Sequence, residues 1–271
     1  MELTTGWTQA AGDSALAYRA RPSAADAPLP AVLVIQEAWG VDGHIQDLTE
    51  RLATAGYLAL APDLYAVGGR PAELAPERIA AVKAFLETVA PSVWTDPAER
   101  ERALHALPQD ERERVSATMS VLFSRRDPEG QLAVLREAVH ALQTDPDCDG
   151  QVGAVGWCMG GGLSGGLAAH EPALGAAVIF YGSPPPEQEV ARIACPVLGL
   201  YGAEDARISA AVPAFAEAAV RSGVSFEHHI YPGAPHAFFN DTRRSYRADA
   251  ARDAWARCLA FFAQYLSPVR A

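Results

Sequence analysis

The sequence predicts an α/β fold in which a mostly parallel sheet is flanked by helices. Two observations predict this class. From residue 152 onward, short apolar runs alternate strictly with longer segments of helical periodicity, and such alternation is typical of parallel sheets. Nearer the N-terminus, residues 31–36 form a continuous apolar run, as expected of a strand buried on both faces. With 271 residues, the chain is long enough for one large domain with a sizeable core.

Each element is predicted from its apolar pattern and from the turn residue that ends it. The first helix, for example, carries Ile45, Leu48 and Leu52 on one face, and Gly56 is a typical helix terminator. The predicted strands are residues 15–20, 31–36, 57–61, 152–155, 176–181, 197–201 and 226–231. The predicted helices are residues 43–55, 161–170, 187–193, 209–222 and 245–266.

Residues 68–130 break this alternation. They hold helical patterns at residues 76–89 and 112–123, separated by charged turns that contain proline, and two ordinary strand–helix units would not need so many residues. We interpret residues 91–127 as a helical insertion within a single domain of residues 1–271. It is expected near the C-terminal edge of the sheet, either as a cap that shapes a site or as a surface helix pair without a role.

Composition excludes several classes of protein. The net charge is −11, from 22 basic and 33 acidic residues, which argues against nucleic acids and anionic membranes as partners. No apolar run reaches the length of a membrane span, and the N-terminus lacks the pattern of a signal peptide. The four cysteines lie far apart, so neither a disulfide nor a zinc site is predicted. A cytoplasmic location with reduced thiols is expected.

The most informative motif is Gly156-Trp157-Cys158-Met159-Gly160, which follows an apolar strand and precedes a helical pattern. It has the form G-x-C-x-G, that of a nucleophile elbow with sulfur in place of the usual serine oxygen. The tight turn leaves no room for side chains two residues before and after the nucleophile. A thiolate here would face a helix N-terminus, which favours negative charge. The alternative is a buried free cysteine in a glycine-rich turn.

The glycines after the cysteine raise a second alternative. Residues 160–165 match the G-x-G-x-x-G pattern of dinucleotide sites, which also requires an acidic residue at the end of the next strand. That strand, at residues 175–181, is followed by residues 182–185, which contain no acid. The glycines at residues 160–162 are therefore interpreted as allowing the helix to pack close to the sheet. No cofactor and no metal are predicted.

A nucleophile at an elbow needs a base and a group that orients the base. Asp205 and His236 each follow a predicted strand, in the order nucleophile, acid, histidine. Taken singly, Asp205 could be a helix N-cap and His236 a loop histidine. The three groups together, each at a strand end and in this order, indicate a catalytic triad with Cys158. Glu204 is the weaker candidate for the acid.

The loop after the strand at residues 31–36 supplies two further elements. In such folds this loop normally provides one oxyanion N–H and the residue after the nucleophile provides the other, which nominates the backbone amides of Ala38 and Met159. Glu37 is an ionisable residue beside this position, in a mostly apolar site. It is either functional or a surface loop glutamate.

Taken together, these motifs resemble the dienelactone hydrolase family over nearly the whole chain. The resemblance rests on residues 36–40 (QEAWG), 62–65 (PDLY), 156–161 (GWCMGG), 202–205 (GAED) and 236–238 (HAF). It implies an α/β-hydrolase fold, with Cys158 as nucleophile, His236 as base and Asp205 as the residue that orients the base. It also implies that Glu37 holds the resting cysteine as a neutral thiol, then swings away on substrate binding and takes the thiol proton.

The departures from the family pattern concern the substrate. The best-known members bind a substrate carboxylate through arginines, one of them four residues after the histidine, where this chain has Asn240. The nearest match to the other arginine is Arg114. We expect the residues in contact with substrate to be Trp39, Arg114, Trp157 and Phe238.

The sequence therefore predicts a hydrolase of small carboxylic esters or lactones that forms a thioester acyl-enzyme on Cys158. Two alternatives stay open. One is a small-molecule-binding protein without catalysis, although such a protein would not need a complete triad. The other is an acyltransferase or thioesterase with the same triad, because fold and nucleophile do not fix the leaving group. The only predicted partner is the small-molecule substrate, and the oligomeric state is left open.

Overall fold

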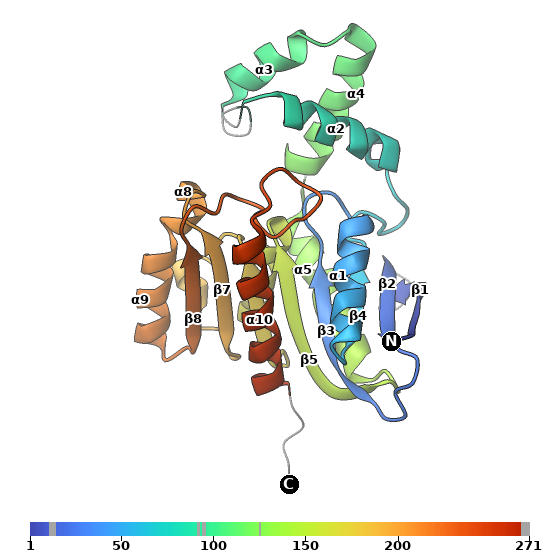
Figure 1. The fold of residues 1–271 in the computed structure, drawn as a ribbon, viewed down its shortest axis with the longest axis vertical. Helices are drawn as coiled ribbons and strands as arrows, with labels where there is room; N and C mark the ends of the chain where they lie inside the picture. The colour runs from blue at the N-terminus through green and yellow to red at the C-terminus, as the bar shows by residue number, and fades with distance from the viewer. Residues whose placement is uncertain (11–14, 91–92, 94–95, 125, 267–271) are drawn as a thin grey trace. The chain divides into compact units, whose positions relative to one another are not determined.

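The computed structural model describes residues 1–10, 15–90, 93, 96–124 and 126–266. Within these residues, eight strands form one sheet in the order β1-β2-β4-β3-β5-β6-β7-β8 (Figure 1). Strand β2 pairs antiparallel with β1 and β4, and all other neighbours in this sheet are parallel. The strands are β1 (Leu3–Ala10), β2 (Ala15–Pro22), β3 (Leu29–Ile35), β4 (Leu58–Pro62), β5 (Cys148–Trp157), β6 (Ala176–Phe180), β7 (Val197–Gly202) and β8 (Phe226–Tyr231).

Helices cover both faces of this sheet. Helices α1 and α10 lie on one face and α5 on the other (Figure 1), and α6 contacts both α5 and α7. The α-helices are α1 (Gly43–Thr54), α2 (Pro76–Thr88), α3 (Pro97–His105), α4 (Gln109–Met119), α5 (Pro128–Gln143), α6 (Met159–His170), α7 (Glu187–Val190), α8 (Ala206–Ser209), α9 (Val212–Ser222) and α10 (Ala248–Tyr265). Two short turns, η1 (Ala72–Leu74) and η3 (Ser120–Ser124), flank α2 and α4.

The structure confirms the α/β-hydrolase arrangement, with differences at its margins. Strand β1 was not predicted, because its residues are almost all exposed and form no apolar run. Helix α5 was also not predicted, although Val134, Leu135 and Val139 have helical spacing and are buried. The single helix expected at residues 209–222 is instead preceded by a separate turn, α8.

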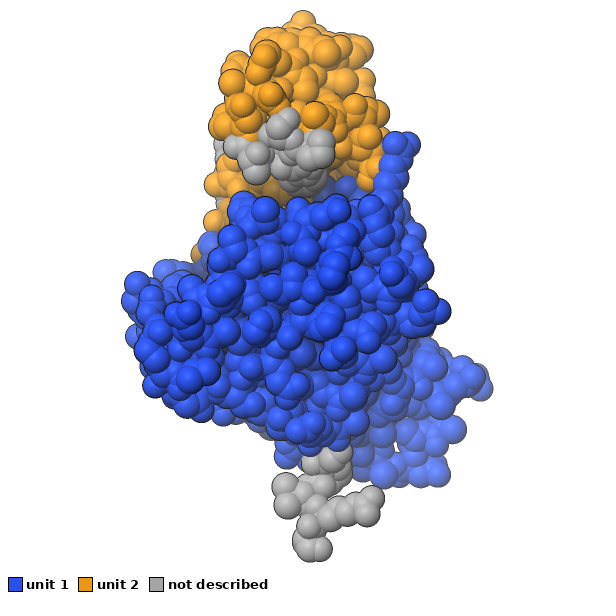
Figure 2. All heavy atoms as spheres, turned by 60° about the vertical axis from the view of Figure 1, so that its left-hand side comes forward, with its two compact units in different colours: residues 1–64, 128–271 blue, residues 65–127 orange. Residues whose placement is uncertain are grey.

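The chain divides into two compact units, coloured separately in Figure 2. Unit 1 comprises Met1–Leu64 and Pro128–Ala271, and unit 2 comprises Tyr65–Asp127. Unit 2 begins before the insertion predicted at residue 91, since α2 packs against α4. The Arg78 Nε donates to Thr118 Oγ1 at 3.2 Å, and the Thr118 hydroxyl donates to the Glu73 carbonyl at 2.8 Å. A role for this unit as a cap stays a prediction.

The parallel strands of unit 1 bring distant parts of the sequence to one edge. Because β3, β5, β6, β7 and β8 run in the same direction, the segments that follow them start at the same edge of the sheet. These segments carry Glu37, Cys158, Tyr181, Asp205 and His236. Among the described helices, none combines the length and apolar composition that a membrane span requires.

Candidate active site

Cys158 lies at a strained turn between β5 and α6. Its φ angle is 55°, in the left-handed region that residues with a side chain rarely adopt. A Cβ atom on Gly156 would lie 1.9 Å from the Gly160 carbonyl oxygen, and one on Gly160 would lie 2.3 Å from the Ile35 carbonyl oxygen. Both positions therefore require glycine, as the elbow motif predicts. The turn presents Cys158 at the N-terminus of α6, where a negative charge is favoured.

The next glycines explain why the dinucleotide pattern appears in this sequence. A Cβ on Gly161 would lie 2.7 Å from the Phe180 carbonyl oxygen, so close packing of α6 on β6 requires glycine there. At Gly162 the nearest atom, the Ser183 carbonyl oxygen, would be 3.6 Å away, which is an ordinary contact. Two of the three glycines thus serve helix–sheet packing.

Cys158, His236 and Asp205 form a continuous hydrogen-bonded chain. The His236 Nε2 lies 3.1 Å from the Cys158 Sγ, and the His236 Nδ1 lies 2.5 Å from the Asp205 Oδ2. Asp205 occupies the N-cap position of α8, but its side chain makes no capping hydrogen bond. Its carboxylate is directed to the imidazole instead, which excludes the capping alternative for this residue.

The surroundings of His236 favour the charged form of its imidazole. Burial of His236 opposes the charged form, but the charge of Cys158 and the hydrogen bond to Asp205 outweigh that effect and raise the pKa of His236 to about 10. An imidazolium at this position would stabilise negative charge that develops on the neighbouring sulfur.

Backbone strain is concentrated around these groups. Within the described residues, the non-glycine residues with positive φ are Cys158 (55°), Tyr181 (38°) and Ala237 (59°). Cys158 directly follows the end of β5, and Tyr181 directly follows the end of β6. Ala237 is the residue after His236. Strained backbone of this kind costs on the order of 1–3 kcal/mol per residue and clusters at functional sites.

Glu37 is buried, with 3% of its surface exposed, and both of its carboxylate oxygens are occupied. The Tyr181 hydroxyl donates to Oε1 at 3.1 Å, and the Asn240 Nδ2 donates to Oε2 at 2.8 Å. Glu37 is therefore no surface glutamate. Within the described residues, no hydrogen bond joins Glu37 to Cys158, whose sulfur faces His236 instead.

The predicted oxyanion donors lie on two segments that pack together. A Cβ on Gly160 would also lie 2.5 Å from the Gln36 carbonyl oxygen, so the first turn of α6 rests on the end of β3. Met159 begins that turn and Ala38 follows that strand. Their role as donors to an oxyanion stays a prediction.

The other cysteines are less accessible than Cys158. Cys148, Cys195 and Cys258 are buried, whereas Cys158 is partly exposed. Burial raises the pKa of all three buried thiols, that of Cys195 to about 12. The core placement predicted for Cys195 and Cys258 is confirmed, and Cys148 lies at the buried start of β5 instead of in a loop.

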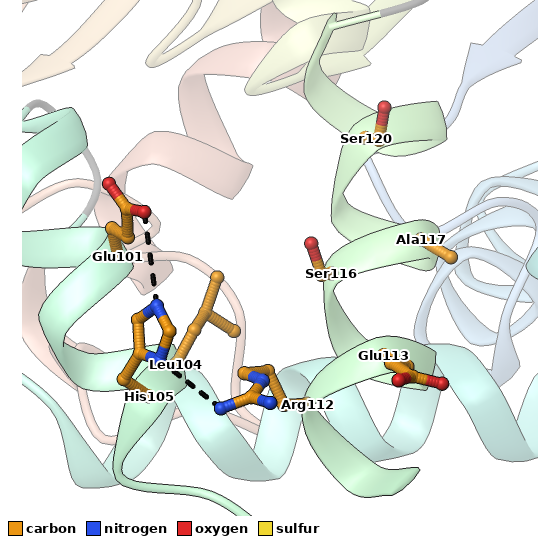
Figure 3. A pocket seen from close by; sticks show the side chains of 8 residues that line it. All are labelled: Glu101, Leu104, His105, Arg112, Glu113, Ser116, Ala117 and Ser120. Atoms are coloured by element: carbon orange, nitrogen blue, oxygen red, sulfur yellow. Dashed lines mark hydrogen bonds and ion pairs between the residues drawn. The ribbon is translucent and has the colours of Figure 1, made fainter. Parts of the chain in front are cut away.

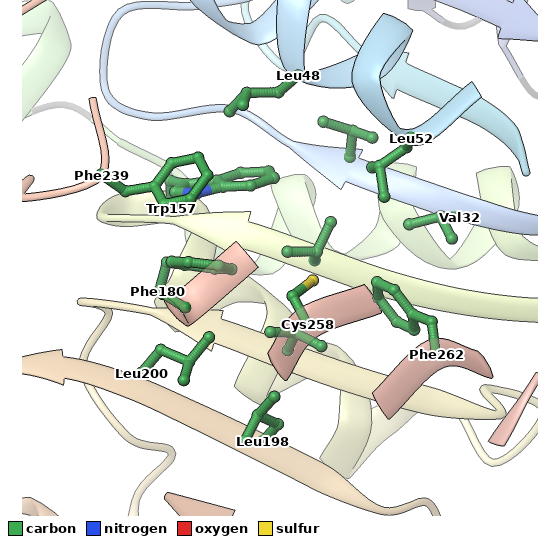
Figure 4. Close-up of a cluster of buried hydrophobic side chains, with 14 of the residues drawn as sticks. Val32, Leu48, Leu52, Trp157, Phe180, Leu198, Leu200, Phe239, Cys258 and Phe262 are labelled. Atoms are coloured by element: carbon green, nitrogen blue, oxygen red, sulfur yellow. The ribbon is translucent and has the colours of Figure 1, made fainter. Parts of the chain in front are cut away.

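Two of the predicted substrate contacts are wrong. Trp157 and Phe238 have no exposed surface. Figure 4 shows Trp157 beside Phe180 and Phe239 in the core, and its ring stacks on Phe180 with the centroids 5.2 Å apart. Side chains alternate along a strand, so Trp157 turns away from the site that its neighbour Cys158 enters. Trp39 is 7% exposed and lies under the Arg243 guanidinium, 5.3 Å from the ring centroid.

Arg114 lies on α4, in unit 2. Its side chain is exposed and its carbonyl oxygen accepts a hydrogen bond from Arg78. A pocket of about 500 Å³ opens within the same unit between α3 and α4 (Figure 3), and Arg112, not Arg114, lines it. Substrate binding by Arg114 stays a prediction.

The sequence reasoning missed two residues of the site, Tyr181 and Asn240. Tyr181 was placed only at the end of a strand, and Asn240 was noted only for the arginine that it replaces. The signal available for Tyr181 was its position directly after β6, at the edge that carries Cys158 and Asp205. No local pattern predicts that either residue binds Glu37, because those contacts span 144 and 203 positions of the chain.

Comparison with known proteins places this chain in a family. The model of the dienelactone hydrolase family matches residues 16–266. The chain belongs to the dienelactone hydrolase family. Accordingly, it is a hydrolase with the α/β-hydrolase fold.

The curated relatives and solved structures agree with this assignment. A Saccharolobus solfataricus protein, provisionally named carboxymethylenebutenolidase, is 38% identical over 86% of this chain and 89% of its own length. An Escherichia coli K12 protein with the same provisional name is 34% identical over 94% of this chain and 84% of its own length. The crystal structure of a provisionally named dienelactone hydrolase from Klebsiella pneumoniae has a TM-score of 0.74 at 33% identity, covering 98% of this chain and 100% of that one.

Proposed function

We propose that this protein hydrolyses small carboxylic esters or lactones through a thioester acyl-enzyme on Cys158. The observation that carries the proposal is the hydrogen-bonded chain from Cys158 through His236 to Asp205 at a strained elbow. The names of the relatives, which refer to a lactone hydrolase, support the substrate class. Sulfur suits reactive esters and enol lactones. Unactivated amides are poor substrates, because a thiolate leaves the tetrahedral intermediate more readily than an amine.

The acylation step follows from the arrangement of the triad. The Cys158 thiolate attacks the carbonyl carbon, and the carbonyl oxygen becomes an oxyanion that the backbone N–H groups of Ala38 and Met159 stabilise. The carbon–oxygen bond to the alkoxide then breaks, and His236 donates its Nε2 proton to the leaving oxygen. In a lactone, acid and alcohol stay joined in one acyl-enzyme.

Deacylation uses the same residues in reverse. Neutral His236 takes a proton from water, and the hydroxide oxygen attacks the thioester carbon. The carbon–sulfur bond breaks, the carboxylic acid leaves, and the imidazolium again faces a thiolate. Asp205 keeps Nδ1 protonated throughout, so that Nε2 is the nitrogen that exchanges protons.

Glu37 is proposed to control when the thiolate forms. In the resting enzyme its carboxylate would accept a hydrogen bond from the Cys158 thiol, which protects the sulfur from oxidation. When substrate binds, Glu37 takes the proton and leaves the sulfur to His236. This role rests on the burial of Glu37 at the edge that carries Cys158 and on the resemblance to the family.

Substitution of Cys158 is the first test. We expect Cys158→Ala to fold normally and to lose at least about a thousandfold in turnover of p-nitrophenyl esters and lactones, as removal of a triad nucleophile does. Cys195→Ala is the matched control, because Cys195 is a buried thiol away from the triad. Full turnover by Cys158→Ala would refute the proposal. Transfer to added alcohols in preference to water would favour the acyltransferase.

Alkylation gives a second readout on the same residue. Iodoacetamide should inactivate the enzyme through Cys158 and spare the three buried thiols. Mass mapping of the modified peptide identifies the site. A mechanism that depends on a reduced thiol also suits the cytoplasm, where we propose that the protein acts.

A further inference from the structure

The hydrogen bonds of Glu37 raise the question of what holds its carboxyl group away from the sulfur. Both partners, Tyr181 and Asn240, are uncharged. Both are buried, Tyr181 completely and Asn240 with 1% of its surface exposed. A buried carboxyl group with a hydrogen bond on each oxygen is held in one orientation.

The orientation of the Asn240 side chain is determined by its other contacts. Its Oδ1 accepts from the Thr242 backbone N–H at 3.0 Å and from the Thr242 hydroxyl at 2.6 Å. The oxygen is therefore used, and the NH₂ group must face Glu37. An NH₂ group only donates, so Oε2 of Glu37 acts as an acceptor in this position.

The segment that carries Asn240 is itself fixed to α1. Asp241 accepts from the Arg51 guanidinium at 2.7 Å, and its other carboxylate oxygen lies 3.6 Å from the buried His44 imidazole. Arg51 also pairs with Asp47 on the same helix at 2.6 Å. These ion pairs limit how far Asn240 can move from Glu37.

Tyr181 differs from Asn240 in what it can do. A hydroxyl group can donate or accept, whereas an amide N–H can only donate. If Glu37 gains a proton, Oε2 still faces a donor, so the proton must reside on Oε1. There the Tyr181 hydroxyl can turn from donor to acceptor without moving. Burial and the neighbouring charges of Glu37 and Cys158 raise the pKa of Tyr181, so its own proton is retained.

Two further observations mark Tyr181 as part of the site. It has a strained backbone, with φ of 38°, and its ring lies edge-on to His236 with the centroids 5.2 Å apart. Tyr181 thus contacts the base and Glu37 at once. The strained backbone is consistent with a tyrosine that must contact both Glu37 and His236 from the end of β6.

On the basis of the proposed function, we propose that Tyr181 and Asn240 are positioning residues that hold Glu37 away from Cys158 in the activated enzyme. The proton that leaves the thiol is bound to Glu37 Oε1 and is donated in a hydrogen bond to the Tyr181 oxygen. In balance, the S–H bond breaks, one O–H bond forms on Glu37, and the electron pair stays on sulfur. Without the two positioning residues, Glu37 returns to the thiol and keeps it protonated.

The test measures the rate of iodoacetamide alkylation of Cys158 between pH 5 and 8 in a double-mutant cycle. In Tyr181→Phe we expect alkylation at pH 6 to be slower by on the order of tenfold, the effect of one like charge near an ionising group. In Glu37→Gln alkylation should be faster than in the wild type. In the double variant Tyr181→Phe with Glu37→Gln, the tyrosine substitution should have no effect.

The matched control is Tyr201→Phe, which removes a buried hydroxyl group for which the described residues offer no hydrogen-bond partner. Its alkylation rate should equal that of the wild type. Asn240→Ala removes the hydrogen bond to the other carboxylate oxygen of Glu37. It should also slow alkylation, and only when Glu37 is present. The test therefore does not depend on the folding of one variant.

Two results would overturn the inference: unchanged alkylation in both Tyr181→Phe and Asn240→Ala, or equal slowing in the presence and absence of Glu37. The second would reduce both residues to structural roles. Alkylation requires no turnover, so these results are independent of the turnover measured with p-nitrophenyl esters and lactones. Only retained turnover in Cys158→Ala contradicts the hydrolase itself.

Discussion

The two units of this chain differ in how firmly they hold their side chains. In unit 1 the strands β4, β6 and β7 have no exposed residue, although β8, the edge strand that precedes His236, is largely exposed or half-buried. In unit 2, α3 buries none of its residues and α4 buries three. The comparison teaches that the central strands of unit 1 are packed on both faces, and such packing supports the precise placement of reacting groups that catalysis needs.

The largest expected effects therefore concern the strand ends of unit 1. His236→Ala should lose at least about a thousandfold in turnover, nearly as much as Cys158→Ala. Asp205→Asn should lose less, since the imidazole still reaches the sulfur in a less favourable tautomer. Steady-state kinetics on one activated ester measures all three. Glu204→Gln is the control, and a larger loss there than in Asp205→Asn would mean that the acid is wrongly assigned.

The contribution of His236 to the stability of unit 1 depends on pH. The folded-state pKa of His236 is raised to about 10, above the value near 6.5 of an unfolded chain. A raised pKa stabilises the folded protein fully below pH 6.5, and this contribution is lost as the pH rises toward 10. The difference in unfolding free energy between wild type and His236→Ala should therefore shrink from pH 6 to pH 10. A difference that grows over this range would contradict the charged pair.

Loss of a leucine side chain should destabilise unit 1 more than unit 2. Leu33, on β3, is completely buried, whereas Leu104, on α3, is partly exposed. We expect Leu33→Ala to lower the free energy of unfolding by about 2–5 kcal/mol, since it leaves a cavity. Leu104→Ala should cost less than about 1 kcal/mol. Urea denaturation followed by circular dichroism measures both, and equal losses would mean that unit 2 is packed as firmly as unit 1.

The features that could be predicted from the sequence lie mostly in unit 1. The order of the parallel strands and the positions of Cys158, Asp205 and His236 could be predicted, because each depends on a local pattern: an apolar run, a glycine where a carbonyl approaches, or a turn at a strand end. Glycine at residue 156 is required by a contact only four residues away. Such constraints are visible in the sequence.

The remainder depends on contacts that sequence patterns do not encode. Asn240 meets Glu37 from 203 positions away, so its role could not be inferred from its neighbours. Trp157 and Phe238 were expected to contact substrate, but both have no exposed surface, because they pack against residues that are distant in the sequence. In unit 2 the weak periodicity of α3 and α4 reflects helices that bury little. The compact unit also includes residues 65–90, which lie outside the insertion predicted at residues 91–127.

The smallest expected effect tests whether unit 2 takes part in catalysis at all. If Arg114 binds the carboxylate of an anionic substrate, Arg114→Ala should raise KM for anionic esters about two- to fivefold, the effect of one exposed ion pair. Neutral esters with the same scissile bond should be unaffected, and added salt should reduce the difference. Arg102→Ala is the matched control, because Arg102 is an exposed arginine of the same unit. Equal changes for both substrate classes, or none, would make Arg114 a solvated helix residue and would confine substrate recognition to the rigid edge of unit 1.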